Sequence, residues 1–139
     1  MDIVSIALCI AQQAHEGQTD KAGQPYINHP MHVAAAVESD EEKAVALLHD
    51  VVEDSNITLD DLRTQGLPEA VVDAVGAMTK RDGEDYVCYL RRVKDNPIAR
   101  VVKIADMEHN SDLSRIPNQT AKDRARVDKY KKGLTILRG

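Results

Sequence analysis

The sequence predicts an all-α fold built from several short helices. Apolar residues recur three and four positions apart in one segment after another, which is the spacing of a single helix face. No stretch alternates apolar and polar residues as a strand does, and hairpin turn pairs between such stretches are missing. The length of 139 residues fits one compact multi-helix domain. Its core must be aliphatic, because the chain has four Tyr but no Phe and no Trp.

The first half of the chain contains end signals for three helices. Asp2 can cap the first helix, and Gly17 ends it. Pro30 suits the first turn of the second helix, and Ser39 or Asp40 can cap the third. We therefore expect these helices at about residues 2–15, 30–38 and 40–54.

The second half is divided in the same way. Thr58 with Asp61 resembles a capping box that opens a short helix, and Gly66 stops that helix. Pro68 and Pro97 each begin a further helix. The remaining helices are predicted at about residues 58–66, 68–78, 84–95, 97–110 and 120–137, with 111–119 as a connecting loop.

Charge and cysteine content restrict the classes of function. The net charge of −5 and the pI near 5.5 argue against binding of nucleic acid or of an anionic membrane, but they permit an anionic small-molecule substrate. Cys9 and Cys88 are predicted to be reduced, partly buried thiols. The chain has no basic leader ahead of an apolar stretch and no apolar run long enough to span a bilayer, so we expect a cytoplasmic protein. The oligomeric state, including a homo-oligomer, is left open.

Residues 47–54 set an imidazole and three carboxylates among leucines and valines of a predicted helix. These polar groups are His49, Asp50, Glu53 and Asp54. Charged groups are costly to bury without partners, and a metal ion is the simplest partner for this set. Taken alone, His49–Asp50 could also be a helix-end histidine beside a surface aspartate.

Two further residues complete a set of metal-ligating types. His29 begins the second predicted helix, and Asp106 lies late in the helix that follows Pro97. Together with His49 and Asp50 they offer two imidazoles and two carboxylates. Such a set suits Mn²⁺, Fe²⁺, Zn²⁺ or Ni²⁺ better than Ca²⁺.

Other polar residues lie one helical turn from these candidate ligands. Glu53 follows His49 by four residues, and Asp54 follows Asp50 by four, so both are placed to act on a metal-bound water or a leaving group. A solvated helix end is the alternative for this pair. His15, His32 and His109 are not expected to be ligands; His15 and His109 are expected at helix ends or beside the ligands, and His32 is expected to pack or to face solvent.

Three segments of the sequence resemble those of HD-domain phosphohydrolases. They are residues 26–30 (Tyr-Ile-Asn-His-Pro), 48–54 (Leu-His-Asp-Val-Val-Glu-Asp), and 103–106 (Lys-Ile-Ala-Asp) followed by His109 and Asn110. More narrowly, they resemble the alarmone hydrolase domain of RelA/SpoT-type proteins and their small free-standing relatives. The resemblance runs from about His15 to Asn110.

This resemblance implies a fold, a cofactor and a reaction. The expected fold is all-α, with one divalent metal ion, Mn²⁺, held by His29, His49, Asp50 and Asp106. The expected reaction is hydrolysis of the 3′-pyrophosphate of (p)ppGpp to GDP or GTP and pyrophosphate. No synthetase domain or regulatory tail fits in 139 residues, so the resemblance implies a free-standing hydrolase.

The resemblance also implies roles for residues outside the metal site. Glu53 and Asp54 match the catalytic Glu-Asp pair, which positions water or transfers a proton. Lys21 matches a basic residue of the loop near the nucleotide, and Asn110 matches a residue near its sugar. Lys103 is a second candidate to offset phosphate charge.

The loop at residues 18–23 departs from the family pattern. Asp20 stands where the family commonly has Arg, Ala22 where it has Ser, and Leu113 where a Thr is often found. An Arg can stack on a guanine base and Asp20 cannot. Two alternatives therefore stay open: an HD-type phosphohydrolase of another nucleotide, such as an adenine alarmone or a nucleotidase substrate, and a non-catalytic nucleotide sensor.

Overall fold

The computed structural model describes residues 2–20, 22–112 and 118–139, and within these ranges the regular structure is helical. Thr19 and Pro25 form one isolated β-bridge, and the described residues contain no strand. The prediction of an all-α fold is confirmed. The helices in chain order are α1 (Ile3–Ala14), α2 (Asn28–Ala35), α3 (Asp40–Leu48), α4 (Val51–Asp54), α5 (Leu59–Thr64), α6 (Glu69–Met78), α7 (Tyr86–Lys94), α8 (Pro97–Asn110) and α9 (Ala121–Arg138).

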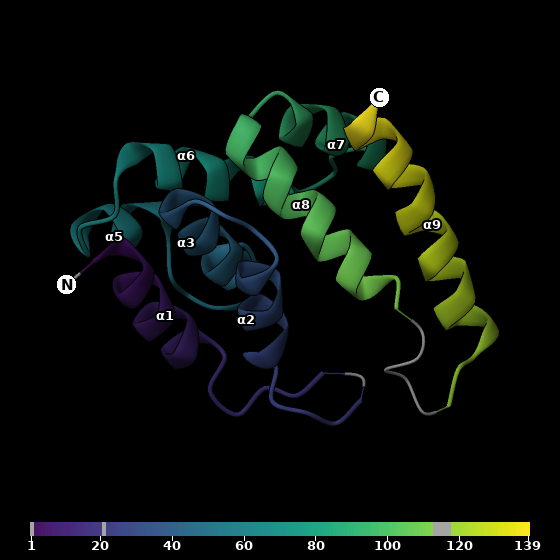
Figure 1. Cartoon of the computed structure of the whole chain (residues 1–139), viewed down its shortest axis with the longest axis horizontal. Helices are drawn as coiled ribbons and strands as arrows, with labels where there is room; N and C mark the ends of the chain where they lie inside the picture. Colours follow the sequence, from purple (N-terminus) through teal and green to yellow (C-terminus); the bar gives the residue numbers. More distant parts are fainter. Residues whose placement is uncertain (1, 21, 113–117) are drawn as a thin grey trace.

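Helix α3 lies at the centre of the fold. It packs against α1, α2, α6 and α8, while α9 packs on α7 and α8 on the side of the molecule away from α1 (Figure 1). Residues 44–48 of α3 and residue 49, which follows it, are all buried, so this helix meets neighbours on all sides. Polar groups at the end of α3 must therefore find partners within the protein.

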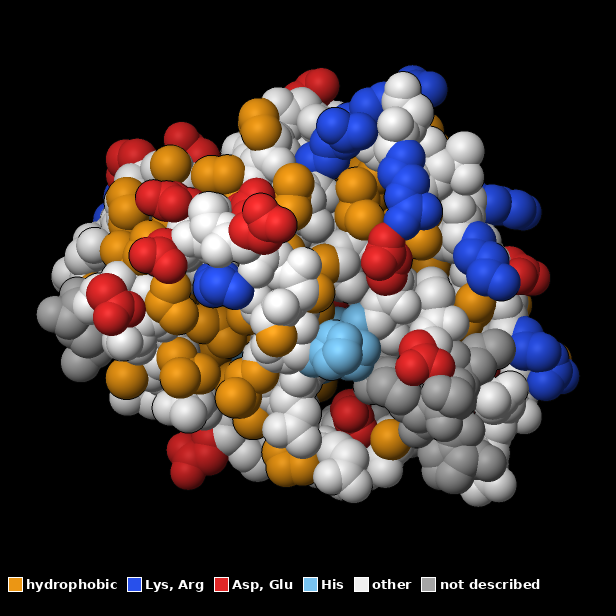
Figure 2. Space-filling view, in the orientation of Figure 1, with side chains coloured by type: hydrophobic (Ala, Val, Ile, Leu, Met, Phe, Trp, Pro, Cys, Tyr) orange, Lys and Arg blue, Asp and Glu red, His pale blue; other side chains and the backbone are white. Residues whose placement is uncertain are grey.

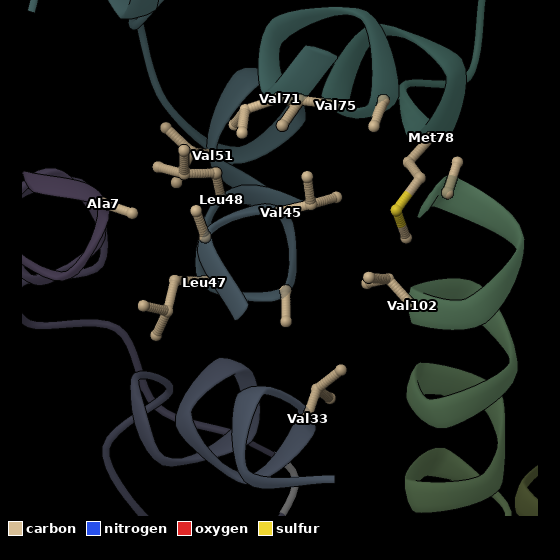
Figure 3. Close-up of a cluster of buried hydrophobic side chains, with 14 of the residues drawn as sticks. Ala7, Val33, Val45, Leu47, Leu48, Val51, Val71, Val75, Met78 and Val102 are labelled. Carbon is tan, nitrogen blue, oxygen red and sulfur yellow. The ribbon is translucent and has the colours of Figure 1, made fainter. Parts of the chain in front are cut away.

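The core is aliphatic, as the composition predicts. Val45 and Leu48 of α3 are fully buried against Val75 of α6 and Val102 of α8. Figure 3 shows these side chains converging between the helices, with Ala7 and Val33 closing the cluster from α1 and α2. Burial of this kind contributes roughly 25 cal/mol per Å² of apolar surface and holds α3 in a fixed position.

The predicted helix caps are present. The Asp2 carboxylate accepts the Ser5 N–H, and Ser39 forms a full capping box with the third residue of α3. Thr58 and Asp61 form the predicted capping box of α5. Each satisfies N–H groups that the first helical turn leaves without an intrahelical acceptor.

The predicted helix 40–54 is interrupted, so this prediction is wrong in one respect. Residues 49 and 50 form a turn between α3 and α4. The Ala46 carbonyl is the acceptor that a continuous helix offers to the Asp50 N–H, and here it accepts the Nδ1–H of His49 at 2.5 Å. A side chain that enters the helical ladder in this way is a recognised cause of helix breaks.

Two smaller expectations also need correction. Helix α2 begins at Asn28, so Pro30 is its third residue and remains within the first turn, where proline is tolerated. Cys9 and Cys88 are free thiols as predicted, but both are exposed and not partly buried. Among the described residues, no helix combines the length and apolar character needed to cross a membrane.

Replacing Leu48 with alanine should destabilise the fold strongly. Leu48 is fully buried in the central helix, and removal of such a side chain leaves a cavity. We expect Leu48→Ala to lower the free energy of unfolding by about 3 kcal/mol in urea denaturation. Val101→Ala, at a position 39% exposed, should change it by less than about 0.5 kcal/mol. Equal effects at the two positions would contradict this description of the core.

Candidate metal centre

The four predicted ligands come together where α2, the α3–α4 turn and α8 meet. His29 Nε2 lies 2.8 Å from Oδ1 of Asp106. His49 Nε2 lies 3.0 Å from Oδ2 of Asp50 and 3.3 Å from Oδ1 of Asp106. One ligating atom from each of His29, His49 and Asp50 falls within 4.8 Å of the others, an arrangement that could hold a metal ion.

Local packing places each of these side chains. His29 is on the buried face of α2 with Pro30 and Val33, and Asp106 follows Val102 by one turn on the buried face of α8. His49 is carried by the buried end of α3. The apolar faces that build the core therefore also direct the polar residues inward.

The tautomer of His49 fits a bound cation. Its Nδ1 donates to the Ala46 carbonyl, so Nε2 is the nitrogen that carries a lone pair whenever the ring is neutral. That nitrogen is buried, and although it lies close to two carboxylates it has no hydrogen-bond partner among the described residues. Two anionic oxygens facing this nitrogen favour a cation between them, which is a proton on Nε2 when no metal is present or a divalent transition metal bound by the neutral ring.

The electrostatics of the cluster favour positive charge between the carboxylates. Burial alone would lower the pKa of His49, but Asp50 and Asp106 outweigh burial and raise it well above its usual value. Burial would likewise raise the pKa of Asp106, yet Lys103 and His49 hold it well below its ordinary range. The pKa of Asp50 falls to about 2, because the charge of His49 outweighs burial. Both carboxylates are thus ionised and ready to bind a cation.

Hydrogen bonds from neighbouring residues orient the two carboxylates. Tyr26 donates its hydroxyl to Oδ2 of Asp50. Asn110 donates to Oδ1 of Asp106 at 3.1 Å, and the ammonium of Lys103 lies 3.0 Å from its Oδ2. Bonds of this kind hold ligand atoms in place and commonly set metal affinity.

Lys103 and Asn110 lie three residues before and four residues after Asp106, so helical spacing places both on its face. Both side chains contact Asp106, rather than extending into solvent. Burial tends to lower the pKa of Lys103, but Asp106 raises it above its ordinary value, so Lys103 stays charged.

Glu53 and Asp54 lie beside the cluster but in different environments. Both are exposed at the end of α4. The N–H of Asp54 donates to the Asp50 carbonyl at 2.9 Å, so Asp54 keeps the helical relation to Asp50. Glu53 Oε1 accepts the N–H of Lys80 at 2.6 Å, which ties it to the segment between α6 and α7. Partial burial and the nearby Asp50 raise the pKa of Asp54.

The Asp20 carboxylate organises its own loop. Its Oδ1 accepts the N–H groups of Ala22 at 2.9 Å and Gln24 at 3.0 Å. This Asx-type turn explains why an aspartate suits the position. The predicted substrate residue Lys21 and the residue Leu113 lie outside the described part of the chain.

Sequence reasoning assigns no role to Tyr26, and it places His15 at a helix end or beside the ligands; the structure shows His15 at the end of α1. Tyr26 was recognised only as part of a resembling segment, although it holds Asp50 directly. His15 is 3% exposed, its Nδ1 is 2.9 Å from Oε1 of Gln18, and its ring lies 4.7 Å from that of Tyr26. The available signal is that both residues lie in the segment between α1 and α2, near its two ends.

One face of the molecule shows where the candidate centre meets the surface. Figure 2 shows histidine side chains gathered near the middle of this face, with acidic side chains close by. His32 is exposed and His109 partly buried, while His29 and His49 lie beneath the surface. The cluster is thus shielded from solvent but close to it.

Comparisons with known proteins agree with this arrangement. The sequence profile of the HD domain matches residues 7–135. The bifunctional (p)ppGpp synthase/hydrolase SpoT of Escherichia coli strain K12 is 34% identical over 119 residues, which cover 75% of this chain and 17% of that protein. A guanosine-3′,5′-bis(diphosphate) 3′-pyrophosphohydrolase of Vibrio cholerae is 43% identical over 77 residues, which cover 52% of this chain and 11% of that protein. The chain thus spans less than a fifth of the length of these relatives.

A solved structure is similar over the whole chain. It is described as a metazoan ortholog of SpoT that hydrolyses ppGpp and plays a role in starvation responses. The TM-score is 0.78 at 25% sequence identity, and the match covers 100% of this chain and 87% of the other. The likeness therefore includes the helices that carry the cluster.

A divalent transition metal should stabilise the protein through these four residues. Metal present at about 100 times its dissociation constant should raise the free energy of unfolding by about 2.7 kcal/mol. His49→Gln and Asp106→Asn should remove this gain, since each deletes a ligand atom. Denaturation with and without metal measures the effect, and an undiminished gain in both variants would contradict the site.

Proposed function

Because the chain belongs to the HD domain family, we propose that it is a metal-dependent hydrolase of the 3′-pyrophosphate of (p)ppGpp, yielding GDP or GTP and pyrophosphate. The observation that carries the proposal is the convergence of two imidazoles and two ionised carboxylates, with an unsatisfied nitrogen on His49. The pyrophosphohydrolase activity named for relatives and the ppGpp hydrolysis reported for the structural neighbour support this choice of substrate.

In this proposal His29, His49, Asp50 and Asp106 hold one Mn²⁺ ion. A mixed set of nitrogen and oxygen ligands suits Mn²⁺, and such an ion supplies a nucleophile near neutral pH and offsets charge on the attacked phosphoryl group. The protein's part is to hold the ligand atoms through the contacts described above.

Glu53 and Asp54 are proposed as the catalytic pair. Both are exposed beside the cluster, so both can reach a substrate bound over it. The raised pKa of Asp54 suits a group that exchanges a proton near the reacting phosphate. Glu53, held by the N–H of Lys80, is placed to orient water or the leaving group.

Lys21 and Asn110 are proposed to contact the nucleotide. Lys21 directly follows Asp20 in the sequence, and Asn110 lies at the end of α8 beside Asp106. Lys103 offsets negative charge at the site through its ion pair with Asp106. That the 139 residues act as one domain in the cytoplasm, with no nucleic-acid or membrane partner, is also part of the proposal, and a homo-oligomer stays compatible with it.

A second candidate is the same chemistry on a different nucleotide. Asp20 lacks the planar group that stacks on guanine, and it engages its own loop. An adenine alarmone or another phosphorylated nucleotide is therefore the alternative substrate. A non-catalytic sensor is less favoured, because it would not need both the ligand set and the acidic pair.

The purified protein with Mn²⁺ should release pyrophosphate from ppGpp. His49→Ala or addition of a chelator should abolish release, because the metal position is lost. Glu53→Gln and Asp54→Asn should each lower kcat by about 100-fold or more. Chromatographic separation of the products identifies the phosphate species.

A substrate panel provides the control for that assay. It includes ppGpp, pppApp, ordinary nucleotides and NADPH at equal concentration. Release of orthophosphate alone would replace the proposed reaction with a phosphatase reaction. Preference for pppApp would assign the adenine alternative. Tight nucleotide binding without turnover would favour the sensor.

Two substitutions at Asp20 separate its structural role from a substrate role. Asp20→Asn keeps the Oδ1 acceptor for the loop N–H groups, so KM should stay within about threefold. Asp20→Ala removes the acceptor and should raise KM by about tenfold, since the loop loses two hydrogen bonds worth roughly 1 kcal/mol each. Similar KM values for the two variants, both far from the unmodified protein, would show that the charge itself matters.

A further inference from the structure

The two ring nitrogens of His29 face different partners. Nε2 lies 2.8 Å from Oδ1 of Asp106, within the candidate metal centre. Nδ1 lies 2.7 Å from Nδ1 of His109. The two rings are nearly parallel, with centroids 5.0 Å apart and an interplanar angle of 16°. His109 is therefore a direct hydrogen-bond partner of a candidate ligand.

Metal binding would determine which nitrogen carries the shared proton. A histidine nitrogen binds a metal through its lone pair, so a neutral His29 that binds through Nε2 carries its proton on Nδ1. This N–H donates to His109, whose Nδ1 must then be unprotonated. Ligand histidines usually donate to a carboxylate, a backbone carbonyl or water. Here the acceptor is an imidazole nitrogen, which brings no negative charge.

We propose that His109 is a positioning residue of the metal centre, which fixes the tautomer and ring orientation of His29 without adding negative charge. The inference rests on the metal-dependent function proposed above. In this proposal an imidazole at position 109, in place of a carboxylate, keeps the site attractive to an anionic substrate.

The charges around the centre support this purpose. Asp50 and Asp106 contribute two carboxylates, and Glu53 and Asp54 add two more beside them. Lys103 offsets part of this negative charge through its ion pair with Asp106. A carboxylate at position 109 would accept the His29 proton equally well. It would, however, add repulsion against a phosphate group in an already acidic site.

His32 offers a matched control within the same stack. The centroids of the His32 and His109 rings are 3.9 Å apart, and the interplanar angle is 20°. His32 is exposed. It is the same type of residue as His109, but its ring stacks on His109 instead of sharing a proton with His29. Loss of His32 therefore tests whether stacking alone accounts for the role.

The test compares Mn²⁺ affinity across four variants, measured from the electron paramagnetic resonance of free Mn²⁺. His109→Leu should weaken Mn²⁺ binding by about 10- to 100-fold, because His29 loses its acceptor. His109→Gln offers an amide oxygen and should stay within about threefold. His32→Leu should stay within about twofold.

The fourth variant separates positioning from charge. His109→Glu should bind Mn²⁺ at least as tightly as the unmodified protein, since a carboxylate is a good acceptor for a ligand histidine. Its KM for ppGpp should nevertheless rise by about tenfold through repulsion of the phosphates. An unchanged KM would overturn the part of the proposal that concerns charge.

Other outcomes are equally decisive. Unweakened Mn²⁺ binding by a folded His109→Leu variant, judged by circular dichroism, would overturn the positioning role. If that variant does not fold, a tenfold loss in His109→Gln would overturn it instead. If the affinities follow the expected order but the unmodified protein does not hydrolyse ppGpp, the proposed function fails and the role of His109 stands.

Discussion

The bond between His49 Nδ1 and the Ala46 carbonyl is the interaction on which the site depends. It ends the regular part of α3, fixes the ring, and directs Nε2 as a buried nitrogen toward two carboxylates. Because α3 packs on four other helices, that nitrogen cannot turn to water. The two carboxylates that face this buried nitrogen therefore make a cation at this position energetically favourable, either a proton on Nε2 or a metal ion.

The core and the centre are built from the same helix faces. Val102 and Asp106 lie one turn apart on α8, and Leu48 and His49 are neighbours at the end of α3. Rigid apolar packing limits the movement of the ligand side chains, and preorganised ligands bind a metal without paying for reordering. Destabilising the core should thus loosen the centre as well.

The sequence predicted the parts of this structure that depend on local patterns. Helix faces and capping boxes such as Thr58 with Asp61 follow from short-range spacing, and the four ligand types were recognisable. The break at His49 was not predictable, because it depends on a side-chain bond to the backbone. The partner of Glu53 lies 27 residues away, and spacing along the chain carries no signal for such a contact.

That distant contact distinguishes two residues that the sequence could only treat together. Asp54 keeps a backbone bond to Asp50, so its position follows the metal ligands. The position of Glu53 instead depends on the segment between α6 and α7, because its carboxylate accepts the Lys80 N–H. Arg92 fixes this segment, because its guanidinium donates to the Thr79 carbonyl and pairs with a carboxylate on the same segment. Any shift of that segment would move Glu53 relative to Asp54, so the two carboxylates have separate supports and are suited to separate roles in proton transfer and water positioning.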